Sequence, residues 1–207
     1  MSILINDELF AIEVLQSRRA SGADRYDEVW DGVYVMSPMA NNEHQSLTTE
    51  LAAAISTIID WQSRGRTLAG ANVSDSRADW NHNYRIPDVL VFLNDSPAID
   101  CGTHWFGGPD FAIEIVSPGD RTLEKLDFYA KVDTRELLVI DRHPWQLTLF
   151  RLSNRRLDPV ACSGTQHSAV ITSEVIPLRL QLDANASFIR LSSPDGSPIR
   201  NVPIVKT

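Results

Sequence analysis

The sequence predicts a mixed α/β fold, in which helices flank a sheet of parallel and antiparallel strands. Two nearly continuous apolar runs, 111–116 and 136–140, are typical of central strands that are covered on both faces. A helical segment that ends at about residue 132 separates them and completes a strand–helix–strand unit. The clearest helix is expected at 42–64, where apolar residues recur at helical spacing. This order of elements favours a mixed sheet with helices packed against it.

Turn and capping residues place the other elements. Asn6 is expected to cap a first helix that runs to about Ala20, and Asp31-Gly32 is a tight-turn dipeptide of the kind found in β-hairpins. Asp120 or Thr122 is expected to cap the helix after the first apolar run. The remaining elements are expected as strands at 26–30, 33–37, 67–73, 86–93 and 146–152, followed by short β-like runs.

Length and composition favour one globular domain over residues 1–207. The chain is 43% hydrophobic and 22% charged, which is enough apolar material for a stable core. We expect a core at about 26–152 and a β-rich C-terminal extension at 153–207. No stretch approaches the roughly 18 consecutive apolar residues of a membrane span, so a cytoplasmic protein is expected. Cys101 and Cys162 have no metal-type spacing and are expected to be reduced thiols.

The charge of the chain argues against indiscriminate adhesion to nucleic acid. The net charge is −8 and the isoelectric point is near 5.0, whereas phosphate binding usually needs a dense basic face. A local basic rim is still compatible with this charge. It could be formed by Arg64, Arg66, Arg77, Arg85 and Arg121, which could equally be scattered, solvated side chains.

Glu114 is the most unusual residue of the chain, because it interrupts the otherwise apolar run 111–116. An unpaired carboxylate in a dry interior is very costly, so a metal ion, a lysine or a set of hydrogen-bond donors should compensate it. Perturbed acids of this kind concentrate at functional sites. The alternative is a glutamate near the strand end that faces solvent or pairs with an arginine.

Asp88 and Lys125 are the other two candidates. Asp88 opens an apolar strand after a proline and by alternation would share a face with its apolar residues, although Pro-Asp is also a common turn dipeptide. Lys125 heads the inward helical stripe that continues with Phe128, Tyr129 and Val132. It should either extend past Phe128 to water or point at an acidic site. Tyr129 is expected to contribute to packing.

These residues together suit a divalent-metal site. The carboxylates of Asp88 and Glu114 and the main-chain carbonyl of Ile115 could hold Mg²⁺ or Mn²⁺ and leave positions for water and phosphate. The Lys125 ammonium could orient the attacking water or offset charge on the phosphate. His44, on the apolar face of the long helix, could contact the metal or assist proton transfer, or it could be a core histidine.

The same residues resemble the signature of a known family, the Uma-two (Uma2) family of restriction-endonuclease-like proteins. The resemblance extends from about Tyr26 to Leu152. It rests on Pro87-Asp88, Glu114-Ile115-Val116-Ser117-Pro118 and Lys125-Leu126-Asp127-Phe128-Tyr129, and it includes Asp31-Gly32, Met36-Ser37-Pro38, His44 and the strand 136–141. It implies the restriction-endonuclease-like fold and a metal-dependent DNA endonuclease site. The wider nuclease pattern has a lysine two positions after the acid. Here that position is Val116, so Lys125 would have to supply the ammonium.

The leading hypothesis is therefore a Mg²⁺- or Mn²⁺-dependent DNA endonuclease with Asp88, Glu114, Lys125 and His44 in its site. The alternative is a non-catalytic dimeric binding or regulatory protein that keeps the nuclease fold, which the charge of −8 favours. A homodimer is expected in both cases from the fold. A third possibility is a metal-free hydrolase that uses Ser117 with Lys125, or the two carboxylates as acid and base, but no nucleophile-elbow pattern surrounds Ser117.

Overall fold

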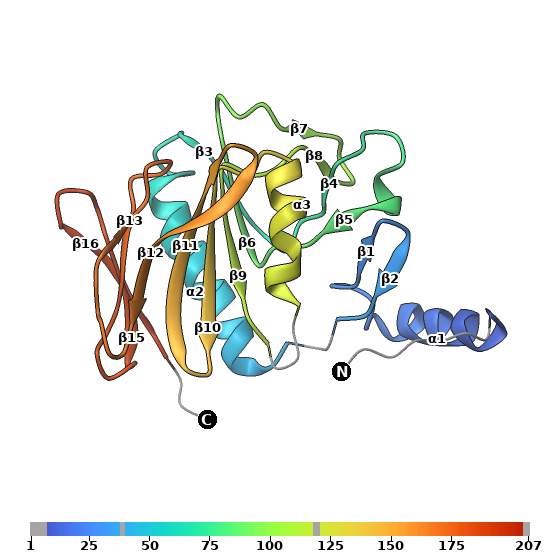
Figure 1. The fold of residues 1–207 in the computed structure, drawn as a ribbon, viewed down its shortest axis with the longest axis horizontal. Coiled ribbons are helices and arrows are strands. Elements are labelled where there is room, and N and C mark those ends of the chain that lie inside the picture. The colour runs from blue at the N-terminus through green and yellow to red at the C-terminus, as the bar shows by residue number, and fades with distance from the viewer. Residues whose placement is uncertain (1–7, 38–39, 118–120, 205–207) are drawn as a thin grey trace.

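The protein is described by a computed structural model that covers residues 8–37, 40–117 and 121–204 (Figure 1). A central sheet has the strand order β12-β11-β10-β9-β6-β3. Its strands are β3 (Gly65–Ala69), β6 (Val89–Leu93), β9 (Phe111–Ile115), β10 (Glu136–Arg142), β11 (Trp145–Ser153) and β12 (Arg156–Gly164). Strands β9 and β10 are parallel, while the other neighbours in this sheet are antiparallel. The predicted mixed α/β fold is confirmed.

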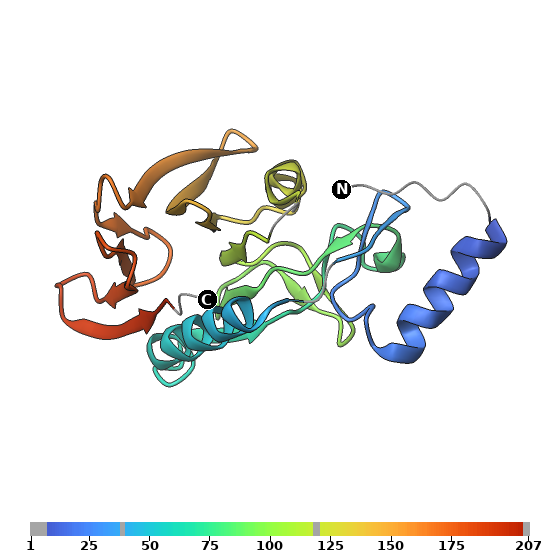
Figure 2. The ribbon, with the colours of Figure 1, turned by 90° about the horizontal axis from the view of Figure 1, so that it is seen from below.

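Helices cover both faces of the central sheet. Seen from below, α2 (Asn42–Ile58) and α3 (Leu126–Lys131) lie on opposite sides of β6 and β9 (Figure 2). Alternate residues of β6 follow this division: Val89 and Val91 join the apolar cluster that contains α2, whereas Leu90 and Phe92 join the cluster that contains α3. Since both faces are covered, a charged residue on β9 has no direct path to water.

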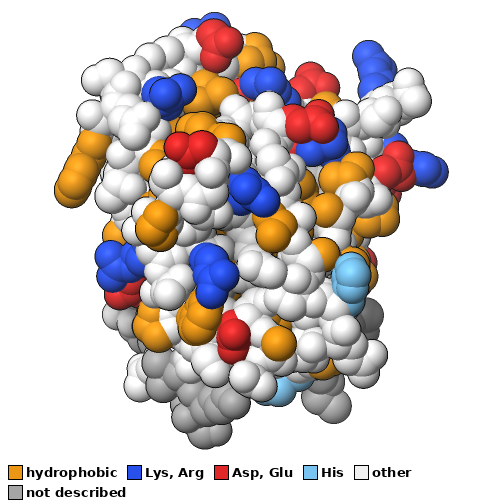
Figure 3. Space-filling model, turned by 90° about the vertical axis from the view of Figure 1, so that its left-hand side faces the viewer, with side chains coloured by type: hydrophobic (Ala, Val, Ile, Leu, Met, Phe, Trp, Pro, Cys, Tyr) orange, Lys and Arg blue, Asp and Glu red, His pale blue; other side chains and the backbone are white. Residues whose placement is uncertain are grey.

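The C-terminal strands form a sheet of their own with the order β13-β14-β15-β16. They are β13 (Ile171–Thr172), β14 (Arg179–Leu182), β15 (Phe188–Ser192) and β16 (Pro198–Pro203). Their buried residues, such as Leu180 and Ile189, belong to the same apolar cluster as those of α2. On this side of the molecule, Lys and Arg are scattered among acidic and apolar side chains and do not gather into a patch (Figure 3).

A third sheet, with the order β2-β1-β5-β4-β8-β7, stands beside the central sheet. Its short strands are β1 (Glu28–Trp30), β2 (Val33–Val35), β4 (Val73–Ser74), β5 (Tyr84–Arg85), β7 (Ile99–Asp100) and β8 (Trp105–Phe106). The predicted turn between β1 and β2 is confirmed: Asp31 and Gly32 have φ of 47° and 83°, as a type I′ turn requires. A Cβ on Gly32 would lie 2.8 Å from the His82 ring, so a larger residue would displace that ring.

Helix α1 (Glu8–Ser21) projects from the body of the molecule (Figures 1 and 2). Arg18 fastens its C-terminal end through Nε, which donates to Asp27 Oδ2 at 2.6 Å, and through Nη2, which donates to the Ser37 carbonyl at 3.0 Å. The expected cap Asn6 lies outside the described residues. No helix in the described part of the chain is long and apolar enough to cross a membrane.

Some predicted boundaries are wrong. Helix α2 ends at Ile58 and not near residue 64, because the chain turns there and Ser63 takes a left-handed conformation with φ of 53°. The strand predicted at 67–73 is divided between two sheets at Gly70, where φ is 65°. The strand predicted at 86–93 begins only at Val89, as β6, because residues 86–88 belong to no strand and β5 ends before them at Arg85.

The helix before β10 begins as the 3₁₀ segment η2 (Thr122–Lys125), and another 3₁₀ turn, η1 (Trp80–His82), precedes β5. Asp120, one of the two predicted caps, lies outside the described residues. Cys101 and Cys162 are free, as predicted.

Candidate active site

Glu114 is the second-last residue of β9 and is only 3% exposed. Lys125 Nζ donates to its two carboxylate oxygens at 3.1 and 3.2 Å, and the Tyr129 hydroxyl also donates to it. Burial raises the pKa of Glu114 to about 8, because the loss of hydration outweighs the attraction of the Lys125 ammonium. The negative charges of Asp88 and Glu28 raise it further. Glu114 is thus a carboxylate whose charge needs a further positive partner.

Lys125 reaches this carboxylate from the crossover between β9 and β10. It ends η2 and its side chain is buried, with Nζ between Glu114 and a second acid, Glu28, whose Oε1 accepts at 3.0 Å. The predicted inward direction of Lys125 therefore corresponds to contact with an acidic site and not to extension past Phe128 to water. The wider nuclease pattern has a lysine at the position of Val116. Here Lys125 at the end of η2 supplies the ammonium to Glu114 instead.

Glu28 is the site residue that the sequence reasoning missed. It lies on β1, is 2% exposed, and accepts hydrogen bonds from the Ile86 amide at 2.8 Å and from Trp30 Nε1 at 2.7 Å in addition to Lys125. Both of its carboxylate oxygens are thus engaged by the protein. Its sequence neighbourhood resembles an ordinary hairpin strand, and Lys125 is 97 residues away, so no local pattern indicated the pairing.

Asp88 lies immediately before β6, at the end of β9 that carries Glu114. Its Oδ2 accepts from the Ile115 amide at 2.7 Å, and its Oδ1 lies 2.6 Å from His44 Nε2. Since β6 begins at Val89, strand alternation does not extend to Asp88. The carboxylate contacts α2 through His44, whereas Leu90 packs on the α3 side, so the predicted shared face is wrong.

His44 sits in the first turn of α2. Its amide donates to the capping side chain of Asn41 at 2.9 Å, and its Nδ1 lies 3.3 Å from Ser117 Oγ just beyond β9. The ring therefore bridges Asp88 and Ser117. This arrangement agrees with a satisfied histidine and also leaves it next to the acid at which chemistry would occur.

Arg142, at the end of β10, fixes the first turn of α2 to the end of β9. Its guanidinium donates to the Val116 carbonyl at 3.0 Å, to Asn41 at 3.0 Å and to Glu43 at 2.8 Å. The sequence reasoning missed this residue as well, because three separate segments meet at it. Its effect is to set the position of His44 relative to Asp88.

The oxygen donors of the site fit a hard divalent cation. The structure brings Asp88 and Ile115 into direct contact, next to Glu114 in the chain. Both Asp88 oxygens and Glu114 Oε2 take part in one described contact each and keep a second lone pair, whereas Glu114 Oε1 already accepts from Lys125 and Tyr129. Within the described ranges, no group of three or more His, Cys, Asp or Glu side chains is arranged to hold a metal. A cation that keeps several water ligands, such as Mg²⁺, suits so small a donor set.

Few of the arginines considered for a basic rim are near this site. Arg85 and Arg121 stack on the ring of Trp30, with guanidinium carbons 4.4 and 4.5 Å from its centroid. Arg66 pairs with Asp100 in another region. Of the arginines considered for the rim, Arg85 and Arg121 therefore lie together at Trp30.

Comparison with known proteins is consistent with this geometry. A model of the Uma2 family, described as "putative restriction endonuclease", matches residues 10–185. A solved structure, a putative nuclease belonging to DUF820 from Anabaena variabilis ATCC 29413, is similar with a TM-score of 0.57 and 18% identity. The alignment covers 71% of this chain and 80% of that chain. At this identity it shows the fold alone. Among curated proteins no match is found.

Proposed function

Because this chain belongs to the Uma2 family, whose description is putative restriction endonuclease, we propose that it hydrolyses phosphodiester bonds in DNA with a divalent metal ion. The observation that carries the proposal is the convergence of residues that are remote in sequence. The Lys125 ammonium contacts the buried Glu114, and Asp88 contacts the next residue of the same strand. The charge of Asp88 raises the pKa of Glu114, so the two acids and the amine interact at one end of β9, which is what phosphoryl-transfer chemistry of this kind needs.

Asp88, Glu114 and the Ile115 carbonyl are the residues that would hold Mg²⁺ or Mn²⁺. When bound, the ion would lower the pKa of a water molecule and offset charge on the phosphate. The raised pKa of Glu114 supports this assignment, since a carboxylate that is hard to ionise gains most from a nearby cation.

Lys125 contacts Glu114, and His44 contacts Asp88, so each acid has its own partner. The Lys125 ammonium holds the Glu114 carboxylate and supplies positive charge close to where the phosphate would become more negative. His44, beside Asp88 and Ser117, is placed to accept or donate a proton at the more open side of the site.

The test is cleavage of supercoiled, linear and single-stranded DNA with Mn²⁺ or Mg²⁺, with and without a chelator. Lys125→Met and Asp88→Asn should each lower the cleavage rate by about 100-fold or more, as for the loss of one charged group in a preorganised site. Asp88→Asn keeps the size of the side chain, so it gives a result even if Lys125→Met fails to fold. Arg156→Met changes an exposed charge on β12 and serves as the control.

A second function, non-catalytic binding or regulation, has one observation in its favour. The buried cluster Glu28–Lys125–Glu114 already balances much of its own charge. If no DNA is cleaved with either metal, Glu114→Gln leaves stability unchanged or higher, and the metal causes no rise in melting temperature, this function replaces the nuclease. A homodimer remains a prediction under both, to be measured by light scattering.

The third possibility, a hydrolase that pairs Ser117 with Lys125, gains no support from the described contacts. Ser117 lies beside His44 and Arg142, while Lys125 lies between Glu28 and Glu114.

A further inference from the structure

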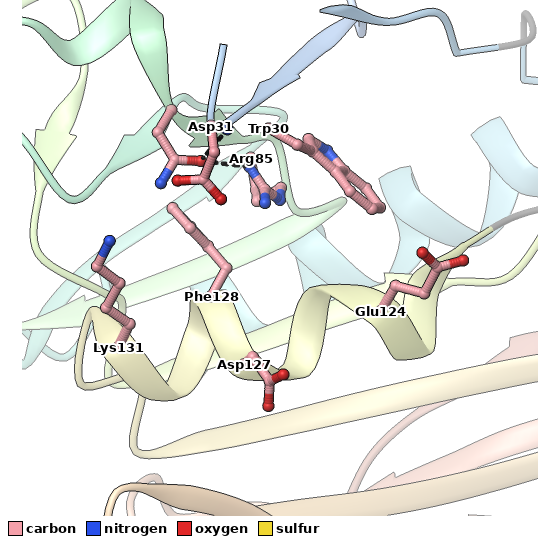
Figure 4. A pocket seen from close by; sticks show the side chains of 8 residues that line it. Trp30, Asp31, Arg85, Glu124, Asp127, Phe128 and Lys131 are labelled. Carbon is pink, nitrogen blue, oxygen red and sulfur yellow. Dashed lines mark hydrogen bonds between the residues drawn. The ribbon is translucent and has the colours of Figure 1, made fainter. Parts of the chain in front are cut away.

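A pocket of about 280 Å³ opens between the β1–β2 turn and α3 (Figure 4). It is lined by Trp30, Asp31, Asn83, Arg85, Phe128 and Lys131, among others. It adjoins the candidate active site, because the Trp30 indole that lines it donates to the buried Glu28, which in turn holds Lys125. Whatever occupies this pocket would lie one side chain away from the buried acids.

Arg85 forms the inner wall of the pocket and is only 4% exposed. Its guanidinium lies between the rings of Trp30 and Phe128, with its central carbon 4.4 and 4.3 Å from their centroids. All of its hydrogen bonds in the described part of the chain start from Nη1 and end on Val29, Tyr84 and Asn83. Nε is buried without a partner. Arg85 thus has unused donors, and within the described residues no carboxylate forms an ion pair with it.

Asp31 lies opposite, at the turn of the hairpin. Its amide donates to Asn83 Oδ1 at 3.1 Å, which fixes the turn against Arg85, since Nη1 of Arg85 donates to the same oxygen. The Asp31 carboxylate lines the pocket and makes no hydrogen bond or ion pair among the described residues. The pocket therefore brings together Arg85, whose Nη2 makes no hydrogen bond among the described residues, and the unpaired carboxylate of Asp31.

We infer that this pocket binds one unpaired nucleobase of the nucleic acid that the active site cleaves, an inference that rests on the proposed nuclease function. A base presents acceptors and donors along one edge of a flat apolar body. Guanine fits best: its O6 and N7 suit arginine, and its N1–H and amino group suit a carboxylate. The volume of about 280 Å³ is just below the roughly 300–1,000 Å³ typical of pockets for drug-sized ligands, so the pocket has room for one base.

A phosphate group is the other chemistry that an unpaired arginine could recognise. Three carboxylates line the pocket, on Asp31, Glu124 and Asp127, and they would repel a phosphate. Glu124 is engaged by Arg121. Asp31, which is the uncommitted carboxylate nearest to Arg85 in Figure 4, decides between the two ligands: it attracts the donors of a base and repels an anion.

The experiment is an NMR titration of the ¹⁵N-labelled full chain, without metal, that follows the Trp30 indole N–H signal. The ligands are deoxyguanosine monophosphate, thymidine monophosphate and inorganic phosphate. Asp31→Asn is the test variant, because asparagine is favoured at this position of a type I′ turn and should preserve the fold. Asp95→Asn removes an exposed carboxylate after β6 and is the matched control.

We expect deoxyguanosine monophosphate to shift the Trp30 signal more strongly than the thymidine nucleotide, and inorganic phosphate to leave it unchanged. Asp31→Asn should weaken binding of the guanine nucleotide roughly fivefold to tenfold, as for the loss of one hydrogen bond, and Asp95→Asn should not. Tighter binding in Asp31→Asn together with a shift caused by phosphate would overturn the inference in favour of an anion site. Absence of any shift at Trp30 would overturn it too.

The inference and the proposed function fail in different ways. Because the titration needs no catalysis, binding of the guanine nucleotide by a chain that cleaves no DNA would support the pocket and reject the nuclease. Metal-dependent cleavage by a chain whose Trp30 signal never responds to a nucleotide would reject the pocket and support the nuclease.

Discussion

The α3 side and the α2 side of the β9 end hold their charges differently. On the α3 side, Glu28, Lys125 and Glu114 are almost completely buried, and the lysine bonds to both acids. On the α2 side, the side chain of Asp88 is 18% exposed and that of its partner His44 is 11% exposed. The buried ionic cluster on the α3 side mainly affects the free energy of folding. The partly exposed Asp88 and His44 on the α2 side can contact a substrate.

Lys125→Met should cause the largest loss of stability. It removes the only cation described between two buried carboxylates, and breaking a buried ion pair from one side costs about 3–5 kcal/mol. Urea unfolding measures the change, with Arg156→Met expected to alter the free energy of unfolding by about 1 kcal/mol or less. Equal effects of the two substitutions would contradict the view that the α3 side is a closed ionic cluster.

The pH dependence of stability should report on Glu114. Its pKa is raised to about 8 in the folded chain, against 4.5 for an ordinary glutamate, so the folded state binds more protons than the unfolded state between these values. Its contribution is therefore fully present below about pH 4.5, declines as the pH rises, and is lost above about pH 8. Chemical unfolding of the metal-free chain across this range should show the decline, and Glu114→Gln should flatten it. An unchanged slope in the variant would assign the dependence to another group.

Glu28→Gln should have an intermediate effect. The amide keeps one acceptor, but its NH₂ group cannot accept from Trp30 Nε1 or from the Lys125 ammonium, and a buried donor without a partner costs about 1–3 kcal/mol. The free energy of unfolding measures the loss. Trp30→Phe removes the same indole donor and is the companion variant. If the two losses add fully in the double variant, Glu28 and Trp30 are not coupled.

His44→Asn should have the smallest effect on stability and a large one on cleavage. It removes a partly exposed hydrogen bond to Asp88, worth about 1 kcal/mol. If the ring transfers a proton, the cleavage rate should fall by about 100-fold or more. Thermal unfolding and DNA cleavage measured on the same preparation separate the two quantities. A variant that is destabilised but cleaves normally would assign His44 a structural role.

Sequence patterns could predict the elements that are buried along their whole length, because such elements appear as continuous apolar runs. The buried strands β9 and β10 appeared as apolar runs, and Glu114 stood out because it breaks one of them. The inward direction of Lys125 followed from helical spacing. The sheet that contains β1 could not be foreseen in this way, since strands such as β4 and β5 have two residues each and show no periodicity.

The missed site residues share a physical cause. Glu28, Arg142 and the hydroxyl of Tyr129 acquire their roles from partners on other elements, so nothing next to them in the chain marks them. Tyr129 was expected to pack, and it is fully buried, but its hydroxyl also binds Glu114. Long-range pairing of this kind depends on the assembled topology and not on local composition.

The location of Lys125 on the segment that joins two parallel strands has a consequence for how this protein could vary. A lysine on a central strand would be fixed by the sheet ladder itself, whereas here its reach depends on how firmly the Phe128 turn of α3 docks. Substitutions that weaken or shift the packing of α3 would move the Lys125 ammonium away from Glu114 and leave the acids in place. The rate of the proposed hydrolysis could thus change through substitutions on α3, with every acidic residue of the site unchanged.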